Sequence, residues 1–291
     1  MVERPPSVTV YLIRHAESRY NAAVKAWDVR ALVGERDHGL SHRGEQQCHE
    51  LSRTIESAAS RGDADAQRLA ASDRVTASSP LCRAVLTAHL ALPNCASTSI
   101  LALPSAREQC KAPVIARDSE GTMASLLQSH VDAELSRARA GGAGARKAAE
   151  VDVSRLPTDG AWWVVGEKTD AVVARLATLL RELYELASAG GGGTGGGAVV
   201  AISHSHAMRH LFRHYATPAF GRSERGAALG STMVENCAVV RVRLELEAPG
   251  EPRIADAELL FGSTFRGKAA KAAHDATGPV VCLWMQYEGK I

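Results

Sequence analysis

The sequence predicts an α/β protein built as a three-layer sandwich, in which a mostly parallel sheet is flanked by helices. Short apolar segments alternate along the chain with longer segments in which apolar residues recur at helical spacing. The first apolar segment, 8–13, carries apolar side chains at both alternating sets of positions, which is typical of a strand buried on both faces. This alternation of strand and helix favours βαβ units in one sheet.

Four segments have the length and composition of buried strands: residues 8–13, 74–78, 99–103 and 198–203. A further segment, 237–247, alternates apolar residues with mainly charged ones. That pattern predicts a half-exposed antiparallel strand at the edge of the sheet, where it would offer a pairing surface.

Three long helices are predicted between these strands. The first begins after Ser41, whose hydroxyl can cap a helix N-terminus. The second has Ser79 as its N-cap and Pro80 at its first helical position, where the missing N–H does no harm. The third has an apolar stripe made of Val172, Leu176, Leu179, Leu180, Leu183 and Leu186.

We expect one domain over residues 1–291, because strands and helices continue to alternate across the low-complexity segments. Residues 104–160 show no clear strand and are expected to form an inserted cap. The glycine-rich stretch 188–197 predicts a flexible loop between a helix and a strand.

The composition narrows the classes of partner. The 34 basic residues nearly balance the 32 acidic ones, so a broad nucleic-acid surface is not expected and any anion binding must be local. No apolar run is long enough to span a membrane, and the first residues lack the apolar core of a signal peptide. The six cysteines form no C-x-x-C pair, which favours reduced thiols. We therefore expect a cytoplasmic protein that binds neither membranes nor nucleic acids.

Polar side chains cluster where the predicted strands end. Arg14 and His15 follow the first strand, Arg83 lies shortly after the second, and His204 follows the fourth. Glu108 lies beyond the third. Ligands of open α/β sheets bind at the carboxyl ends of the strands. Two guanidinium forks, two imidazoles and a carboxylic acid together suit a phosphoryl group.

Four motifs carry a family resemblance: "LIRHAES", "DHGLSHRGEQQ", "SSPLCRAVLTA" and "VVAISHSHAMRHL". In this order they resemble the histidine phosphatase superfamily, in its phosphoglycerate-mutase-like branch. The resemblance covers roughly residues 8–245. It implies a phosphoglycerate-mutase-like fold and phosphoryl transfer through a phosphohistidine, with a small phosphorylated substrate and no cofactor or metal.

The resemblance also implies roles for individual residues. His15 would be the nucleophile, and Arg14, Arg83 and His204 would hold the phosphoryl oxygens, with His204 also part of the catalytic set. Asn21 would bind phosphate from a loop that lines the pocket. Glu108 would be the proton donor, with Asp118 and Glu120 as alternatives because the match around it is loose.

Departures from the family pattern decide between its activities. Ala16 and Ser205 stand where the family usually has glycine, and "ALVGERDHGL" lacks the tryptophan found in mutases. Because of the missing tryptophan we favour a phosphomonoester phosphatase, with a phosphoglycerate-type phosphomutase as the first alternative. A catalytically degenerate member that serves as a structural or interaction subunit is the second. The substrate and the oligomeric state stay open.

Other polar residues have simpler interpretations. His206, His210 and His214 share one face of a helix, but no acidic partner stands at a fitting spacing, so packing or solvation is favoured over a metal site. Asp37, Asp170 and Arg175 are interpreted as solvated or capping charges.

Overall fold

The computed structural model describes residues 7–95, 99–110, 119–140, 148–189, 198–247 and 250–267. Their strands form one seven-stranded sheet in the order β4-β3-β2-β5-β1-β6-β7. All pairings from β4 to β1 are parallel, whereas β6 pairs antiparallel with both β1 and β7. The strands are β1 (Ser7–Arg14), β2 (Val75–Ser78), β3 (Ile100–Ala102), β4 (Val151–Asp152), β5 (Val199–Ser203), β6 (Val239–Glu247) and β7 (Glu251–Leu260).

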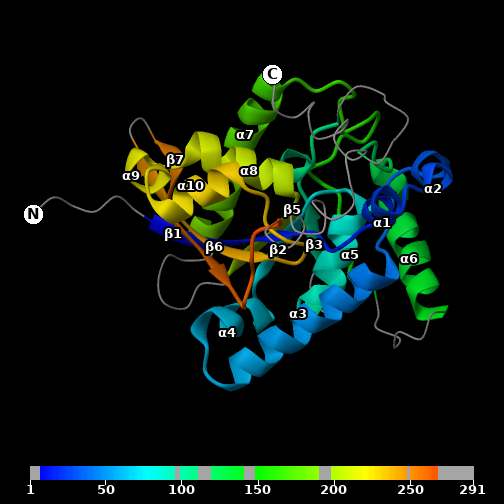
Figure 1. The fold of residues 1–291 in the computed structure, drawn as a ribbon, viewed down its shortest axis with the longest axis horizontal. Coiled ribbons are helices and arrows are strands. Elements are labelled where there is room, and N and C mark those ends of the chain that lie inside the picture. The colour runs from blue at the N-terminus through cyan, green and yellow to red at the C-terminus, as the bar shows by residue number, and fades with distance from the viewer. Residues whose placement is uncertain are drawn as a thin grey trace, which may run out of the picture.

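Helices cover both faces of this sheet, as Figure 1 shows. One layer contains α3 (His42–Ser60), α4 (Ala64–Ala70), α5 (Cys82–Ala91) and α6 (Ala124–Ala140). The other contains α7 (Thr169–Ala189), α8 (Ser205–Tyr215), α9 (Pro218–Gly221) and α10 (Glu224–Ser231). The short helices α1 (Arg19–Ala26) and α2 (Val29–Gly34) follow β1, and η2 (Pro104–Ala106) follows β3. The predicted α/β fold class is confirmed.

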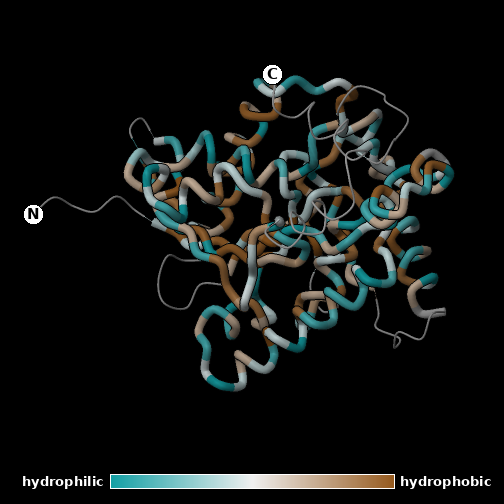
Figure 2. Tube along the Cα trace, viewed as in Figure 1, coloured by the Kyte–Doolittle hydropathy of each residue, from teal (hydrophilic) through white to brown (hydrophobic). Residues whose placement is uncertain are grey.

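The alternation of side chains along β1 explains the two layers. Tyr11 and Ile13 are fully buried in the core beneath α3–α6, whereas Val10 and Leu12 belong to the core beneath α7–α10. A strand that is buried on both faces must be apolar throughout, as the sequence of β1 is. The hydrophobic colouring of the central strands in Figure 2 follows from this.

Two strand predictions are corrected. The segment around β6 is antiparallel as predicted, but it does not form the sheet edge, because β7 pairs along its whole length. The stretch 104–160 does contain a strand, β4, which pairs with β3, as well as η2 and α6. A two-residue strand has no alternation for a sequence pattern to show. The cap over 104–160 stays a prediction, and residues 111–118 and 141–147 lie outside the described residues.

Two helix predictions also change. The helix after β2 begins at Cys82 with Leu81 as its N-cap, so Ser79 and Pro80 precede it. Residues 20–39, expected as a loop, hold α1 and α2. Ser41 does cap α3, since its side chain accepts a hydrogen bond from Gly44 N. The glycine-rich stretch lies mostly outside the described residues, from residue 190. No helix of the described ranges has the length and apolar character needed to cross a membrane.

Candidate functional site

The register of the central strands brings three chain segments to one edge of the sheet. Arg14 at the end of β1 pairs with Ser203 at the end of β5. The next residue, His15, donates its backbone N–H to Ser203 O at 3.0 Å, and Ser79 N donates to Ile202 O at 2.8 Å. The residues that follow β1, β2 and β5 therefore meet where ligands of parallel sheets bind.

The geometry around His15 fixes its tautomer. Its Nδ1 lies 2.6 Å from the carbonyl oxygen of Ala16, and since a carbonyl oxygen only accepts, Nδ1 must carry the proton. The Nε2 of the neutral ring then carries the lone pair. Asn236 donates from Nδ2 to His15 O at 2.8 Å, which holds the backbone of this residue in place. His15 is thus a buried imidazole whose Nε2 lone pair is not used by its proton.

His204 lies beside it, with the two ring centroids 4.9 Å apart. Its Nε2 lies 2.8 Å from Ser79 Oγ, and that hydroxyl also accepts from Leu81 N at 3.3 Å. A hydroxyl that already accepts one bond is suited to donate its proton to Nε2, which leaves the proton of the neutral His204 ring on Nδ1. The Nδ1 atom is buried and has no hydrogen-bond partner among the described residues. It is therefore a donor available to an incoming anion.

Two arginines complete the cluster. Arg14 and Arg83 are 3% and 2% exposed. Arg14 donates from Nη1 to Val234 O at 2.6 Å, whereas its Nε is buried without a partner among the described residues. Arg83 is the second residue of α5, so its charge lies in the first turn of that helix. A helix N-terminus and buried guanidinium groups favour an anion at the same place.

The electrostatics agree with this assignment. Burial and the charges of Arg83 and Arg14 hold the pKa of His15 well below its usual value. The pKa of His204 is lowered in the same way, by burial first and then by Arg83 and His15. Burial, with the charge of Arg266, lowers the pKa of Arg14 to about 10. At neutral pH two neutral imidazoles therefore face two guanidinium cations, a combination that an anion would stabilise.

These pKa shifts predict how a phosphatase activity at this site would depend on pH. The family resemblance implies that His15 attacks as a neutral imidazole, and its lowered pKa would keep it neutral as the pH falls through 6.5. We expect the acid limb of kcat/KM to lie below pH 6.5, because kcat/KM reports the ionisation of free enzyme. A pH–rate profile with a nitrophenyl phosphate measures it. An acid limb centred at or above pH 6.5 would show that the imidazole is not desolvated as described.

Glu108 reaches the edge of this cluster. Its charge raises the pKa of Arg14 and of His210, which places the carboxylate near both side chains. Its Oε1 accepts a hydrogen bond from Gln109 N at 2.9 Å. Of the alternative acids, Glu120 is buried and lies 3.9 Å from Arg36 Nη1, and Asp118 lies outside the described residues.

Asn21 has a structural contact at the start of α1. Its side-chain oxygen accepts from Ser18 N at 3.3 Å, while Ser18 Oγ accepts from Asn21 N at 3.1 Å, so the two form a capping box. Asn21 stands in a helix and not in the expected loop. Its part in phosphate binding stays a prediction.

Of the charges interpreted as solvated or capping, Asp37 is a cap, and both Asp37 and Arg175 are buried rather than solvated. Asp37 is 1% exposed and accepts from Cys82 N at 2.8 Å, so it caps α5 from a distant part of the chain. Arg175 forms an ion pair with the buried Glu167. Ser79, Asn236 and Glu167 were not singled out as site residues by sequence reasoning. Only Ser79 carried a signal, because it directly follows a predicted strand.

The histidines of α8 do not form a metal cluster in the described part of the chain. The rings of His210 and His214 stack with centroids 5.7 Å apart. Across the described ranges, no three His, Cys, Asp or Glu side chains are grouped so as to hold a metal ion.

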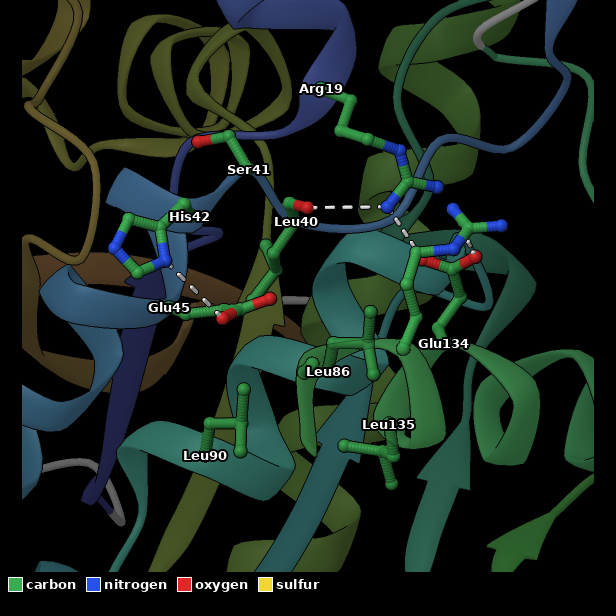
Figure 3. Close-up of a pocket in the computed structure, with 11 residues that line it drawn as sticks. Arg19, Leu40, Ser41, His42, Glu45, Leu86, Leu90, Glu134 and Leu135 are labelled. Carbon is green, nitrogen blue, oxygen red and sulfur yellow. Dashed lines mark hydrogen bonds and ion pairs between the residues drawn. The ribbon is translucent and has the colours of Figure 1, made fainter. Parts of the chain in front are cut away.

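A separate cavity of about 280 Å³ lies between α3, α5 and α6 (Figure 3). Its floor is apolar, with Leu86, Leu90 and Leu135, and its rim includes Glu45 and the ion pair of Arg19 with Glu134. None of Arg14, His15, Arg83, Glu108 and His204 lines it. The cavity is therefore distinct from the candidate active site.

The role of Arg83 can be tested by a charge-conserving substitution. Arg83→Lys keeps the charge but loses the planar fork that holds two phosphoryl oxygens at once. We expect Arg83→Lys and Arg83→Ala to be similarly impaired, with kcat/KM lowered by about a hundredfold, the scale of one lost oxyanion donor. Steady-state kinetics on both variants provide the measurement. Near-normal turnover of the lysine variant would place Arg83 outside the site.

No family model matches the chain, and no curated protein matches it in sequence. Solved structures do resemble it. Phosphoglycerate mutase from Bacillus anthracis matches with a TM-score of 0.47 and 17% identity over 87% of this chain and 93% of that one. A mycobacterial glucosyl-3-phosphoglycerate phosphatase matches with a TM-score of 0.44 and 19% identity over 87% and 97%. A protein described as mycobacterial hydrolase 2 matches with a TM-score of 0.46 and 18% identity over 93% and 97%.

These are likenesses of fold at low sequence identity. The activity proposed below rests on the geometry of the site itself.

Proposed function

We propose that the protein hydrolyses phosphomonoesters through a phosphohistidine intermediate on His15. One observation carries this proposal: a buried imidazole with its proton fixed on Nδ1 has its pKa lowered by burial and by the charges of the buried Arg83 and Arg14. Among the described residues, Arg14 Nε and His204 Nδ1 are buried without a hydrogen-bond partner, which leaves them able to bind an anion. A phosphomonoester dianion satisfies all of these groups together.

The reaction has two displacements. In the first, the Nε2 lone pair of His15 attacks phosphorus, the bond to the leaving oxygen breaks, and Glu108 gives that oxygen its proton. In the second, water attacks the phosphohistidine, the P–N bond breaks, and Glu108 takes a proton from the water. The products are an alcohol and inorganic phosphate. Covalent catalysis divides one difficult step into two easier ones, and the fixed donors stabilise the transferring group in both.

The charges of the site make a metal ion unnecessary in this mechanism. Arg14, Arg83 and His204 supply the positive charge and the hydrogen-bond donors that Mg²⁺ or Zn²⁺ supply in other phosphoryl-transfer sites. We expect kcat/KM to change less than about twofold after dialysis against a chelator. A tenfold loss of kcat/KM corresponds to about 1.4 kcal/mol of activation free energy. A loss of activity that zinc or magnesium restores would contradict the mechanism and favour a metal site at the histidines of α8.

A screen of phosphorylated metabolites and phosphopeptides tests the proposed function, with phosphate release measured for wild type and His15→Ala. Release by wild type alone supports the phosphatase. Phosphoryl transfer between the positions of a sugar acid, dependent on a bisphosphoglycerate primer, would instead support the mutase. Binding without turnover in both proteins would support a degenerate subunit.

Three cysteines of the described residues, Cys48, Cys82 and Cys237, are free thiols. Free thiols persist in reducing compartments, and they support our proposal that the protein works in the cytoplasm on a small phosphorylated substrate.

A further inference from the structure

Beside the candidate active site lies a buried ion cluster, which we define as Arg107, Glu167 and Arg175. Glu167 accepts from Arg107 Nη2 at 2.6 Å and from Arg175 Nε and Nη2 at 2.9 and 3.0 Å. The side chains of Glu167 and Arg175 are 3% and 9% exposed. The charge of Arg175 contributes to the lowered pKa of His204, so the cluster lies close to the phosphoryl site.

The cluster is bonded to the segment that carries Glu108, on both sides of that residue. On the N-terminal side, Arg175 Nη1 donates to the carbonyl oxygens of Ser105 at 2.7 Å and of Arg107 at 2.9 Å. On the C-terminal side, Gln109 Nε2 donates to Glu167 O at 2.7 Å. The backbone therefore has little freedom to rotate at Glu108.

A third connection anchors the end of the same segment. The backbone N–H groups of Gly166 and Glu167 donate to Cys110 O at 2.9 and 3.0 Å. Residues 105–110 are thus held by one short stretch, 166–167, and by one side chain of α7. The side chain of Glu108 accepts a hydrogen bond from the neighbouring Gln109 N at 2.9 Å, whereas Glu167 and Arg175 hold the backbone on either side of it.

Stability alone does not account for this arrangement. Burying two guanidinium groups around one carboxylate costs desolvation energy that the ion pairs repay only in part, and apolar replacements are often as stable. The pKa of Arg107 is lowered to about 10 by burial and by the charge of Arg175, which reflects that cost. A proton donor, by contrast, gains from an exact position, because a displacement of about 1 Å can cost a hundredfold in rate.

We propose that Glu167 and Arg175 are positioning residues that hold the carboxylic acid of Glu108 against the leaving oxygen. The proposal rests on the proposed function, since it assigns a role relative to the acid of that reaction. It predicts that substitutions in the cluster change the kinetics in the same way as substitutions of Glu108, and in a different way from substitutions of His15 or Arg83.

The test uses Arg175→Lys, which keeps the charge but cannot bond Glu167 and both carbonyl oxygens together. An alkyl phosphate needs a proton on its leaving oxygen and a nitrophenyl phosphate hardly does. We expect Arg175→Lys to lower kcat/KM for the alkyl substrate roughly tenfold to a hundredfold and for the aryl substrate less than about threefold. Arg181→Lys, an exposed residue of the same helix paired with Glu251 at 3.3 Å, is the matched control and should change neither.

A double-mutant cycle separates positioning from general stabilisation. If Arg175 acts through Glu108, Arg175→Lys should have no further effect on the alkyl substrate once Glu108 is glutamine. Equal slowing of both substrates, or losses that multiply in the double variant, would overturn the proposal. If Glu108→Gln itself fails to distinguish the substrates, the proposed function fails first, so the two failures are distinguishable.

A second variant tests the proposal in case Arg175→Lys does not fold. Gln109→Met keeps the volume of the side chain and leaves the ion cluster untouched, but removes the bond to Glu167 O. We expect a smaller selective loss on the alkyl phosphate. Circular dichroism and thermal unfolding identify any variant that does not fold. If Arg175→Lys does not fold, Gln109→Met decides: a selective loss supports the proposal and its absence overturns it.

Discussion

His15→Gln is expected to lower kcat for every phosphomonoester by on the order of 10⁴-fold or more, the scale at which removal of a covalent nucleophile acts in other enzymes. Glutamine can keep the hydrogen bond to Ala16 O that the imidazole makes at 2.6 Å, so the fold around it should persist. Its amide nitrogen has no free lone pair, however, and cannot attack phosphorus. The measurement is rapid-quench trapping with a labelled substrate.

Wild type should carry acid-labile phosphate on a peptide that contains residues 14–19, and His15→Gln should carry none. His214→Gln is a suitable control, because His214 stacks on His210 in the same helical layer and is not part of the proposed site. Label on Ser18 or Cys110 in place of His15 would contradict the assignment of the nucleophile.

The strands were the part of the fold most accessible to sequence reasoning. β1 and β5 are buried on both faces, so their apolar runs stand out from the flanking residues, and the predicted ends lie within a residue or two of the observed ones. β4 has two residues and β7 alternates weakly, so neither gives a pattern to read. The error over β6 has the same origin: a strand shows its own alternation but not whether another strand pairs beside it.

Some residues of the candidate site could be predicted from the sequence and others could not. Arg14, His15 and His204 could be predicted because each stands at the end of a strand or directly after it, and parallel strands bring their carboxyl ends together. Glu167 and Arg175 could not, because their partners at 105–110 are 57 to 70 residues away in the chain. Arg175 lies in an ordinary amphipathic helix, and a charge at such a position is usually solvated. Only the packing of α7 against η2 shows that it is buried.

Asp37 shows that a helix cap, too, can come from a distant part of the chain. Its carboxylate accepts from Cys82 N and from Thr122 Oγ1, at 2.8 and 2.9 Å, and so connects α5 with the segment before α6. A helix cap is usually sought within a few residues of the helix start. Here a residue 45 positions earlier caps α5, whereas the local sequence pattern predicts Ser79 as the N-cap and Pro80 as the first helical residue.

Glu108→Gln is expected to lower kcat/KM for alkyl phosphomonoesters by roughly 10²–10⁴-fold, the usual contribution of a general acid, and kcat/KM for nitrophenyl phosphates only mildly. An alkoxide is a poor leaving group until it is protonated, whereas a nitrophenolate leaves without help. Glutamine keeps the size of the side chain and can remain near Arg14, but it has no acidic proton. Parallel measurement of kcat/KM on the two substrate classes gives the contrast directly, and Glu120→Gln serves as the control because its carboxylate lies near Arg36. Equal slowing of both classes, or of neither, would remove Glu108 from the role of proton donor, and a selective effect of Glu120→Gln would assign that role to Glu120.

The phosphohistidine intermediate should behave differently in the two displacements. In Glu108→Gln, the aryl substrate should still phosphorylate His15 at a near-normal rate. The phosphohistidine should then decay slowly, because the same carboxylate is needed to activate the water in the second displacement.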